Sequence, residues 1–315
     1  MIWWIVGVAV LFLFLAGMAW QRWAAAKERA AFPCPGKMVD VPGARMHVLA
    51  RGEGPRIVLL SGWNTAAPSV DFQPLADELI SRGFRVVTPE KPGYGFSTDT
   101  AVPRELDVVS DALRLALRKA GEPGPYLLLG HSMAGTELVR WANRFPQEVL
   151  ALYSLDAPAP ECYTHVPLPP LWMRHVQRFQ RFFGLKRLSM AIPRLRKSYW
   201  KYLNQYAYLD AKLLPVEKAM VIKNGGNRAT WDEMKRLPAN ARVAGGEVPR
   251  QIPLMMFIAS DTKDNRWDAL QPTEDAFIER HHARTMVVEG MHNLQHFQPA
   301  QIAEVIAQDK EMLHI

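Results

Sequence analysis

The chain contains little cysteine: only Cys34 and Cys162 occur among its 315 residues. Two cysteines exclude a disulfide framework and a cysteine-rich zinc site. Internal repeats and low-complexity tracts are also absent, and the composition, with 49% hydrophobic and 22% charged residues, is that of an ordinary globular protein. A chain of this length and composition is expected to form one large α/β domain with an insertion, or two domains of medium size.

Charged residues are absent between Ile2 and Trp20. As a helix these 19 residues would cover about 29 Å, close to the roughly 30 Å of a bilayer's hydrocarbon core. Tryptophan prefers membrane interfaces, and four of the ten tryptophans lie at the two ends of this run: Trp3, Trp4, Trp20 and Trp23. We therefore predict a transmembrane helix over residues 2–20, followed by a stalk and linker over residues 21–36.

A cleaved secretory signal is the alternative for this segment, because small residues at 17–19 or 24–26 can form a cleavage site. Signal peptides carry basic residues before a shorter apolar region, whereas no basic side chain precedes this run, so a retained anchor is favoured. Arg22, Lys27 and Arg29 follow the span, and the positive-inside rule places them and the domain behind them in the cytoplasm.

Strand-like and helix-like segments alternate after residue 37, which favours an α/β fold with a mostly parallel central sheet flanked by helices. Strands are predicted at residues 38–41, 46–50, 56–60, 84–88, 126–129, 149–155, 254–259 and 285–289, and the main helices at 72–81, 104–120, 133–145 and 298–313. The long stretch before residue 254 shows no strand pattern and predicts helices separated by prolines. The expected domains are a core of residues 37–157 and 251–315 and a helical cap, or lid, of residues 158–250 inserted before the last two strands.

The most specific motif is a serine in the sequence Gly-His-Ser-Met-Ala-Gly, at residues 130–135. An apolar strand ends there, the serine follows at a tight turn, and a helix begins at once. Such a turn strains the serine backbone, so the residues two positions away on each side must be small, as Gly130 and Ala134 are. The helix that follows directs backbone N–H groups toward the serine oxygen. The pattern predicts that Ser132 is a nucleophile.

A serine nucleophile needs a base that is oriented by an acid. His292 is the best candidate base, because it follows the last predicted strand and Gly290 allows the chain to turn before it. His296 is the reserve candidate. The remaining candidates lack a matching context: His47, His165, His175, His281 and His282.

The acid is expected at the end of the strand 254–259, where Asp261 and Asp264 both stand. We favour Asp261 because it follows the strand end more directly, and Asp264 is the alternative. Asp156, which ends the preceding strand, is a third candidate, although a role in capping the loop into the cap is favoured for it. The resulting chain order of serine, acid and histidine is the one that accompanies this type of serine turn.

Two backbone N–H groups are expected to stabilise an oxyanion beside Ser132. The first is that of Met133, directly after the nucleophile. The second is that of Trp63, in the loop after the strand 56–60, where Gly62 permits a close approach.

Together these motifs resemble the α/β-hydrolase superfamily from about Lys37 to the carboxyl end. The likeness lies in the oxyanion loop at 62–63, the turn Pro-Glu-Lys-Pro-Gly-Tyr-Gly-Phe-Ser at 89–97, the serine turn at 130–135 and the histidine segment at 290–299. The chain is also similar to bacterial members with a Pro-Tyr-x-Leu-x-Gly-His-Ser-Met segment and an Ile-Ser-Asp acid segment, which supports Asp261. The resemblance implies an α/β-hydrolase fold and a Ser132, Asp261 and His292 triad, without a metal or organic cofactor.

Three positions depart from the pattern of that family. Ser61 stands where a histidine precedes the oxyanion loop, Ala134 replaces a glycine, and Ala259-Ser260 replaces the glycine ahead of the acid. The first change is compatible with function because the oxyanion donors are backbone groups. The last change weakens the assignment of the acid.

Acidic residues are absent from Cys162 to Leu209, which contain nine of the 38 Lys and Arg residues. The rest of the chain has 29 basic and 31 acidic residues, so the net charge of +7 comes from this segment. Two amphipathic stripes carry its apolar side chains: Trp172, Val176, Phe179 and Phe183, then Ile192, Leu195, Tyr199 and Tyr206. We expect the apolar face to cover the active site and the basic face to be solvated or to meet anionic lipid headgroups. Beyond the cap's basic stretch, a capping box at Thr230 predicts the start of a further helix.

The predicted function is that of a membrane-anchored serine hydrolase that cleaves a carboxylic ester through an acyl-enzyme. Its expected partners are a small-molecule ester or acyl substrate and membrane lipids, but not nucleic acid, because no nucleic-acid-binding module is recognised. Hydrolysis of another bond on the same fold, such as a C–C, lactone or N-terminal proline amide bond, is the alternative. A non-catalytic binding protein on a hydrolase fold is the third hypothesis.

Overall fold

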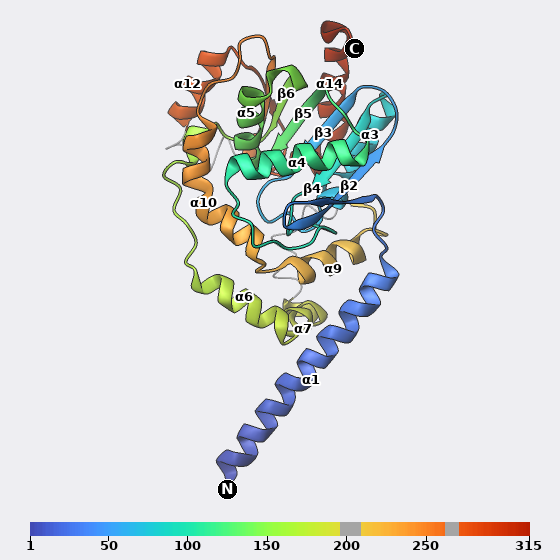
Figure 1. Ribbon diagram of the computed structural model, residues 1–315, viewed down its shortest axis with the longest axis vertical. Helices are drawn as coiled ribbons and strands as arrows, with labels where there is room; N and C mark the ends of the chain where they lie inside the picture. Colours follow the sequence, from blue (N-terminus) through green and yellow to red (C-terminus); the bar gives the residue numbers. More distant parts are fainter. Residues whose placement is uncertain (196–208, 262–270) are drawn as a thin grey trace.

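In the computed structural model, which describes residues 1–195, 209–261 and 271–315, eight strands form one sheet in the order β1-β2-β4-β3-β5-β6-β7-β8 (Figure 1). The strands are β1 (Lys37–Val41), β2 (Ala44–Arg51), β3 (Arg56–Leu60), β4 (Arg85–Glu90), β5 (Tyr126–His131), β6 (Val149–Leu155), β7 (Leu254–Ala259) and β8 (Arg284–Val288). The first hairpin and the β2/β4 pair are antiparallel, and the other neighbours are parallel. The prediction of a mostly parallel sheet is confirmed.

Helices cover both faces of the sheet. On one face α3 (Gln73–Ser81) packs against α14 (Pro299–Leu313), and on the other α4 (Leu106–Ala120) packs against α5 (Gly135–Arg144). Successive residues of β5 show why both faces are needed: Leu127 and Leu129 enter one buried cluster and Leu128 enters the other. Strands that are buried on both faces have continuous apolar runs, and this is why their boundaries were visible in the sequence.

One further helix, α12 (Gln271–His281), and several short elements complete the core. The short elements are α2 (Pro68–Asp71), η1 (Ser132–Ala134), η2 (Pro146–Glu148) and α13 (Leu294–Phe297).

The described part of the cap, residues 158–250, is helical; in the chain it follows β6 and precedes β7, and its helices lie outside the sheet (Figure 1). Its elements are η3 (Pro160–Tyr163), α6 (Trp172–Phe182), α7 (Leu185–Ala191), α9 (Leu214–Asn224) and α10 (Arg228–Ala244). The predicted start of the last helix at Thr230 is wrong. The α10 helix begins one turn earlier, because the Asn227 side chain caps it by accepting a hydrogen bond of 2.9 Å from the Thr230 N–H. The prediction that the first apolar stripe covers the active site is wrong: Trp172, Val176 and Phe179 are exposed, and Phe179 and Phe183 contact Phe14 of the amino-terminal helix. Tyr199 and Tyr206 of the second predicted stripe lie outside the described residues.

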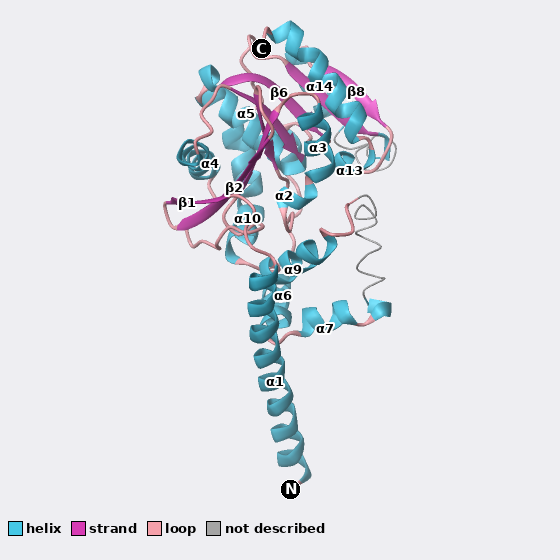
Figure 2. Ribbon diagram, turned by 90° about the vertical axis from the view of Figure 1, so that its right-hand side faces the viewer, coloured by secondary structure: helices cyan, strands magenta, loops and turns pink. Residues whose placement is uncertain are grey.

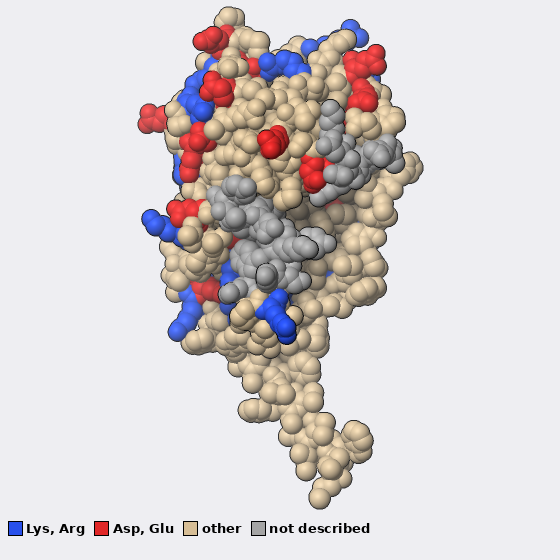
Figure 3. Space-filling model, turned by 180° about the vertical axis from the view of Figure 1, so that it is seen from behind, with Lys and Arg blue, Asp and Glu red and all other residues tan. Residues whose placement is uncertain are grey.

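The predicted span and stalk form one unbroken helix, α1 (Ile2–Ala31), which projects away from the body (Figure 2). It is long and apolar enough to cross a membrane, with a mean hydropathy of 2.4 over its most apolar window and none of that window buried. Charged side chains are missing from its outer end in the view of Figure 3, where Lys and Arg instead appear at the level at which α1 joins the body. The junction with the cap includes Phe14, whose ring lies 5.6 Å from that of Phe179 and 4.6 Å from that of Phe183.

Candidate active site

Ser132 lies at the point where β5 ends and a helix begins. Its φ angle is +55°, in the left-handed region that side chains rarely adopt. Position 130 requires glycine, because a Cβ there would lie 2.8 Å from the Leu138 side chain and 3.0 Å from the Ala134 carbonyl oxygen. The strained turn predicted from the sequence is therefore present.

The structure brings His292 to this serine from the loop after β8. The Nε2 atom of His292 lies 2.9 Å from Ser132 Oγ, and the side chain is one-quarter exposed. Because Nδ1 faces a carboxylate, it carries the ring proton, and Nε2 is left to accept the hydrogen bond from the serine hydroxyl.

The carboxylate beside His292 belongs to Asp156, directly after β6. Its Oδ2 atom lies 2.5 Å from His292 Nδ1, and its Oδ1 atom accepts a 2.9 Å hydrogen bond from the Ala259 N–H. The Asp156 side chain is buried, and its backbone has a φ angle of +45°. Held by β7 on one side, this carboxylate is fixed in the position that orients the imidazole.

Asp261, the predicted acid, is not the partner of His292. Its backbone N–H donates to Gly290 O at 3.2 Å, and no ion pair joins its side chain to His292, although both residues are described. Asp264, the alternative, lies outside the described residues. The sheet topology explains why Asp156 takes the place predicted for Asp261. The β6 strand pairs with β5, whereas β7 is one strand further away, so the end of β6 is nearer to the nucleophile. Sequence reasoning had the signal, since Asp156 follows β6 as Ser132 follows β5.

The other histidines near the site have different partners. His131 Nε2 lies 3.0 Å from the carbonyl oxygen of His292 and therefore donates to it. Burial, with the nearby His292 adding to it, lowers the pKa of His131 to about 4, so this ring stays neutral. His296, the reserve candidate base, is buried against Asp71, with Nε2 at 3.0 Å from Oδ1. This contact ties α13 to α2, and among the described residues no hydrogen bond joins His296 to Ser132.

The two segments predicted to hold an oxyanion both lie at Ser132. A Cβ on Gly62 would come within 2.8 Å of Ser132 Cβ, so the glycine lets the loop after β3 approach the nucleophile. The Trp63 indole N–H donates to the Thr230 carbonyl oxygen at 2.8 Å, which ties this loop to the cap. Met133 is buried, with its own backbone at the start of η1.

Sequence reasoning missed Tyr163, a buried residue of η3 whose hydroxyl interacts with Ser132. Burial raises the pKa of Tyr163, so its hydroxyl remains a hydrogen-bond donor. It packs in an apolar cluster beside the nucleophile, formed by Met133, Tyr163, Leu237 and Ala241 with Trp63, Val166 and Met234 against them. Tyr163 ends the short helix η3 that follows β6, and no local sequence pattern marks it as a site residue.

A buried ionic network joins the core to the cap beneath this cluster. Lys91 Nζ lies 2.6 Å from a carboxylate oxygen of Glu137 on α5 and 2.6 Å from one of Glu233 on α10. Arg104 pairs with the second oxygen of Glu233 at 3.2 Å. Each of these side chains is almost completely buried, so the cap helix is held by charges that compensate one another.

No group of three or more His, Cys, Asp or Glu side chains in residues 1–195, 209–261 and 271–315 is arranged to hold a metal ion. What the site offers is a hydroxyl, an imidazole and a carboxylate joined in series. This is the arrangement that activates a serine for attack on an electrophilic carbon.

Comparison with known proteins identifies the fold family. Residues 55–299 match a family model described as alpha/beta hydrolase fold. The chain is similar to the uncharacterized protein YbdG of Bacillus subtilis, with 28% identity over 284 residues, covering 88% of this chain and 86% of that protein. It is also similar to a pimeloyl-[acyl-carrier protein] methyl ester esterase of Nitrosomonas europaea, with 29% identity over 53% of this chain and 58% of the esterase. Among solved structures, the epoxide hydrolase VrEH1 from Vigna radiata has the same fold, with a TM-score of 0.61 and 17% identity over 88% of this chain and 97% of that one.

Proposed function

The chain belongs to the α/β-hydrolase fold family and is a hydrolase, and from this premise we propose that it cleaves a carboxylic ester by a Ser132, His292 and Asp156 triad. One observation carries the proposal: 2.9 Å separate the serine Oγ from His292 Nε2, and 2.5 Å separate His292 Nδ1 from the Asp156 carboxylate. The two contacts leave each ring nitrogen with one defined role.

The proposed reaction has two halves. In the first, Ser132 Oγ attacks the ester carbonyl carbon while His292 Nε2 takes the hydroxyl proton, and the imidazolium then gives that proton to the departing alcohol. The acyl group remains on Ser132 as an ester. In the second half, His292 takes a proton from water, the hydroxide attacks the acyl carbon, and the proton returns to Ser132 as the acid leaves. Asp156 stabilises the imidazolium in both halves and stays ionised.

The oxyanion that forms in each half lies where two loops meet. We assign the backbone N–H groups of Met133 and Trp63 to it, because Gly62 places the second loop against Ser132. The Tyr163 hydroxyl lies beside Ser132 on the cap side of the same space.

A serine nucleophile favours an ester over an epoxide as the substrate, although the chain resembles proteins named for both reactions. Attack of Ser132 on an epoxide carbon would leave an ether on the enzyme, which water at this site cannot cleave. Attack on a carbonyl leaves an ester, which the same triad can hydrolyse. The apolar cluster around Tyr163 further suits an acyl group as the part of the substrate that is held.

We further propose that α1 anchors the enzyme in a membrane with its cap at the bilayer surface. The contact of Phe14 with Phe179 and Phe183 places the end of α6 beside the apolar part of α1. Exposed apolar side chains continue across this end of the cap: Leu171, Trp172, Met173, Val176, Phe179, Phe182, Leu185 and Leu188. Such a surface is costly in water and is typical of a contact with a membrane.

Labelling with a fluorophosphonate probe tests the triad, because the probe reacts only with an activated serine. We expect labelling of the full-length wild-type chain and none of the Ser132→Ala variant. Equal labelling of the two would overturn the assignment of the nucleophile. A series of acyl esters of increasing chain length, assayed on membrane fractions, then identifies the substrate class. Alkaline extraction of the membranes tests the anchor, since an integral helix keeps the chain in the pellet.

A further inference from the structure

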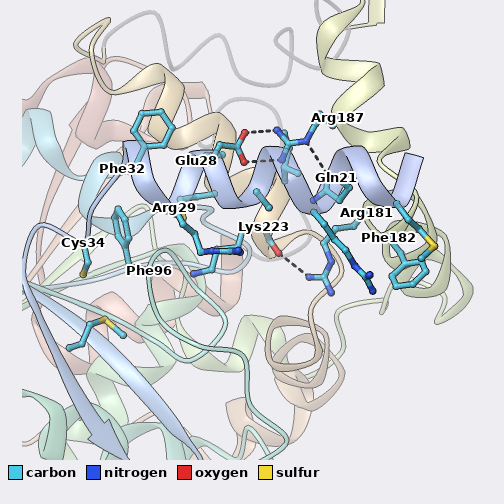
Figure 4. A pocket seen from close by; sticks show the side chains of 17 residues that line it. Gln21, Glu28, Arg29, Phe32, Cys34, Phe96, Arg181, Phe182, Arg187 and Lys223 are labelled. Atoms are coloured by element: carbon cyan, nitrogen blue, oxygen red, sulfur yellow. Dashed lines mark hydrogen bonds and ion pairs between the residues drawn. The ribbon is translucent and has the colours of Figure 1, made fainter. Parts of the chain in front are cut away.

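A cavity of about 530 Å³ lies between α1 and the cap, apart from the proposed active site (Figure 4). Its walls come from the last turns of α1, from α6, α7 and α9, and from the loops before β1 and after β4. None of its lining residues belongs to the apolar cluster around Tyr163 or to the Ser132, His292 and Asp156 triad. The proposed reaction therefore leaves this cavity unexplained.

The polar lining of the cavity is predominantly cationic. Its charged side chains are Arg22, Glu28, Arg29, Arg181, Arg187 and Lys223. Glu28, the acidic member, already forms a bidentate pair with Arg187. Among the described residues, no ion pair joins any of the other four cations to a carboxylate.

Three of these cations lie on the same side of α1. In Figure 4 the Arg29, Arg181 and Lys223 side chains lie on one side of the helix, and the Glu28–Arg187 pair lies on the other. Backbone carbonyls fix two of the three. Lys223 Nζ donates to Gly95 O at 2.7 Å and Ser97 O at 3.1 Å, and Arg181 donates to the Lys223 carbonyl at 2.9 Å.

Two of these cations are partly desolvated by the protein, although Arg29 and Lys223 keep contact with solvent and Arg181 is half-buried. Burial lowers the pKa of Lys223 against the opposing effect of Glu90, and Arg29 acts in the same direction as burial. Burial also lowers the pKa of Arg181 against the opposing effect of Asp99. A cavity that partly desolvates cations is stabilised when an anion enters it.

Apart from Gln21, which accepts a hydrogen bond of 2.9 Å from Arg187, the rest of the lining is apolar, which distinguishes the cavity from a site for a small inorganic anion. The apolar part consists of Met18, Ala25, Phe32, Met38, Phe96, Phe182, Ala219, Met220 and Ile222 with the Cys34 side chain. The cavity therefore combines cations with apolar side chains, which matches an anionic amphiphile.

The height of the cavity along α1 matches the headgroup layer of a bilayer. Its lining begins at Met18, near the end of the apolar run that closes at Trp20, and continues to Phe32. Between Met18 and Arg29 the helix rises about 16 Å, which takes the cavity from the edge of the hydrocarbon core through the interfacial region.

We propose that this cavity binds the headgroup of an anionic phospholipid. Arg29, Arg181 and Lys223 hold the phosphate, and an acyl chain passes the Met18 and Phe182 side chains toward the bilayer. The inference rests on the proposed membrane anchoring, but it does not depend on the triad. Electrostatic binding to anionic lipids gains about fivefold in affinity for each cation near the surface.

Native mass spectrometry of the full-length chain released from nanodiscs tests the proposal. The nanodiscs contain equal amounts of phosphatidylglycerol and phosphatidylcholine, and the measured quantity is the ratio of the two lipids that remain bound. We expect the wild type to retain phosphatidylglycerol preferentially. The Arg29→Gln/Lys223→Gln double variant should lose about 25-fold of that preference. A Lys212→Gln/Lys235→Gln variant removes the same charge from exposed positions of the cap that do not line the cavity and should behave as wild type.

A second variant tests the shape rather than the charge. Ala25→Trp fills the cavity from α1 and should abolish lipid retention while keeping every cation. Fluorophosphonate labelling of each variant shows that it is folded, and incorporation into the nanodisc reports the anchor separately. Equal retention of both lipids by the wild type would overturn the proposal. Loss of retention in the control variant, or displacement of the lipid by millimolar inorganic phosphate, would also overturn it, the latter showing a free-phosphate site.

Discussion

Lys91 and Lys223 both lie at the boundary of the cap, but Lys91 is fully buried whereas Lys223 keeps contact with solvent. Burial acts to lower the pKa of Lys91, yet Glu137 and Glu233 outweigh it and raise the pKa above its usual value. For Lys223 partial burial outweighs the opposing effect of Glu90 and lowers the pKa. The hydrogen-bond partners of Lys223 are neutral carbonyls. One region of the molecule therefore compensates its charges internally, and the other leaves cations for a ligand.

The difference separates structure from recognition. A cation that lies between two buried carboxylates holds two elements together and has no capacity left for an external anion. A cation fixed by carbonyls keeps its charge available. The site around Ser132 belongs with the first class, since the acid, the base and the nucleophile each find their partner within the chain.

The largest expected effect concerns the internal partners of the triad. Asp156→Asn should lower kcat by about 10⁴-fold, because an amide no longer fixes the histidine tautomer or stabilises the imidazolium. Asp261→Asn, the matched control, should retain activity to within about threefold. Steady-state hydrolysis of a soluble short-chain ester measures both. The reverse order of effects would restore Asp261 as the acid and contradict the geometry.

The second effect concerns the stability of the compensated region. Lys91→Met leaves Glu137 buried without its cation and Glu233 with Arg104 alone, and it should destabilise the fold by about 3–5 kcal/mol. Chemical denaturation of the detergent-solubilised chain, followed by circular dichroism, measures the loss. Adding Glu137→Gln to this variant should recover part of the stability, because Glu233 keeps Arg104 as its cation. A loss below about 1 kcal/mol in the single variant would show that the network is not compensated as described.

A third prediction concerns Glu274, a largely buried carboxyl whose charged neighbours are the carboxylates of Asp156 and Asp275. Burial, with the Asp156 carboxylate adding to it, raises the pKa of Glu274 to about 7 from a usual value of 4.5. The folded state therefore holds this proton more tightly than the unfolded state. The resulting stability is fully present below pH 4.5 and is lost as the pH rises through 7.

Glu274→Gln keeps a neutral group at this position at every pH. The variant should match the wild type near pH 4.5 and exceed its stability above pH 7 by on the order of 2 kcal/mol. Denaturation curves at several pH values measure the difference. A constant difference across this range would mean that the pKa of Glu274 is the same in the folded and the unfolded chain, which would contradict the prediction.

The smallest expected effect is at the uncompensated lysine. Lys223→Met removes no partner from a buried carboxylate, so the free energy of unfolding in detergent should change by no more than about 1 kcal/mol. The free energy of unfolding of this variant should be compared with that of Lys91→Met, measured under identical conditions. A loss as large as that of Lys91→Met would show that Lys223 supports the fold rather than a ligand.

The sheet could be predicted because the buried strands have continuous apolar runs with turn residues between them. The nucleophile and base could be predicted for a local reason: Ser132 is marked by the small residues Gly130 and Ala134, and His292 by its place after the last strand.

The acid and the cap contacts depend on distant residues and could not be predicted in the same way. Asp156 and Asp261 each follow a parallel strand at the same edge of the sheet, and the position of β6 beside β5, which only the folded sheet sets, favours Asp156 as the carboxylate that meets His292. Tyr163 reaches Ser132 by the folding of the cap over the core, and Asn227 replaces the expected cap of α10. Such choices are made by tertiary packing, which a local pattern does not encode.

The unbroken course of α1, from Ile2 to Ala31, has a consequence for the kinetics of the enzyme. With this helix in a bilayer, no flexible linker separates the catalytic body from the lipid, and a substrate that is itself a lipid reaches it by lateral diffusion. Encounter then becomes a search in two dimensions. The rate would depend on the mole fraction of substrate within the bilayer, and diluting the membranes in buffer would leave turnover unchanged.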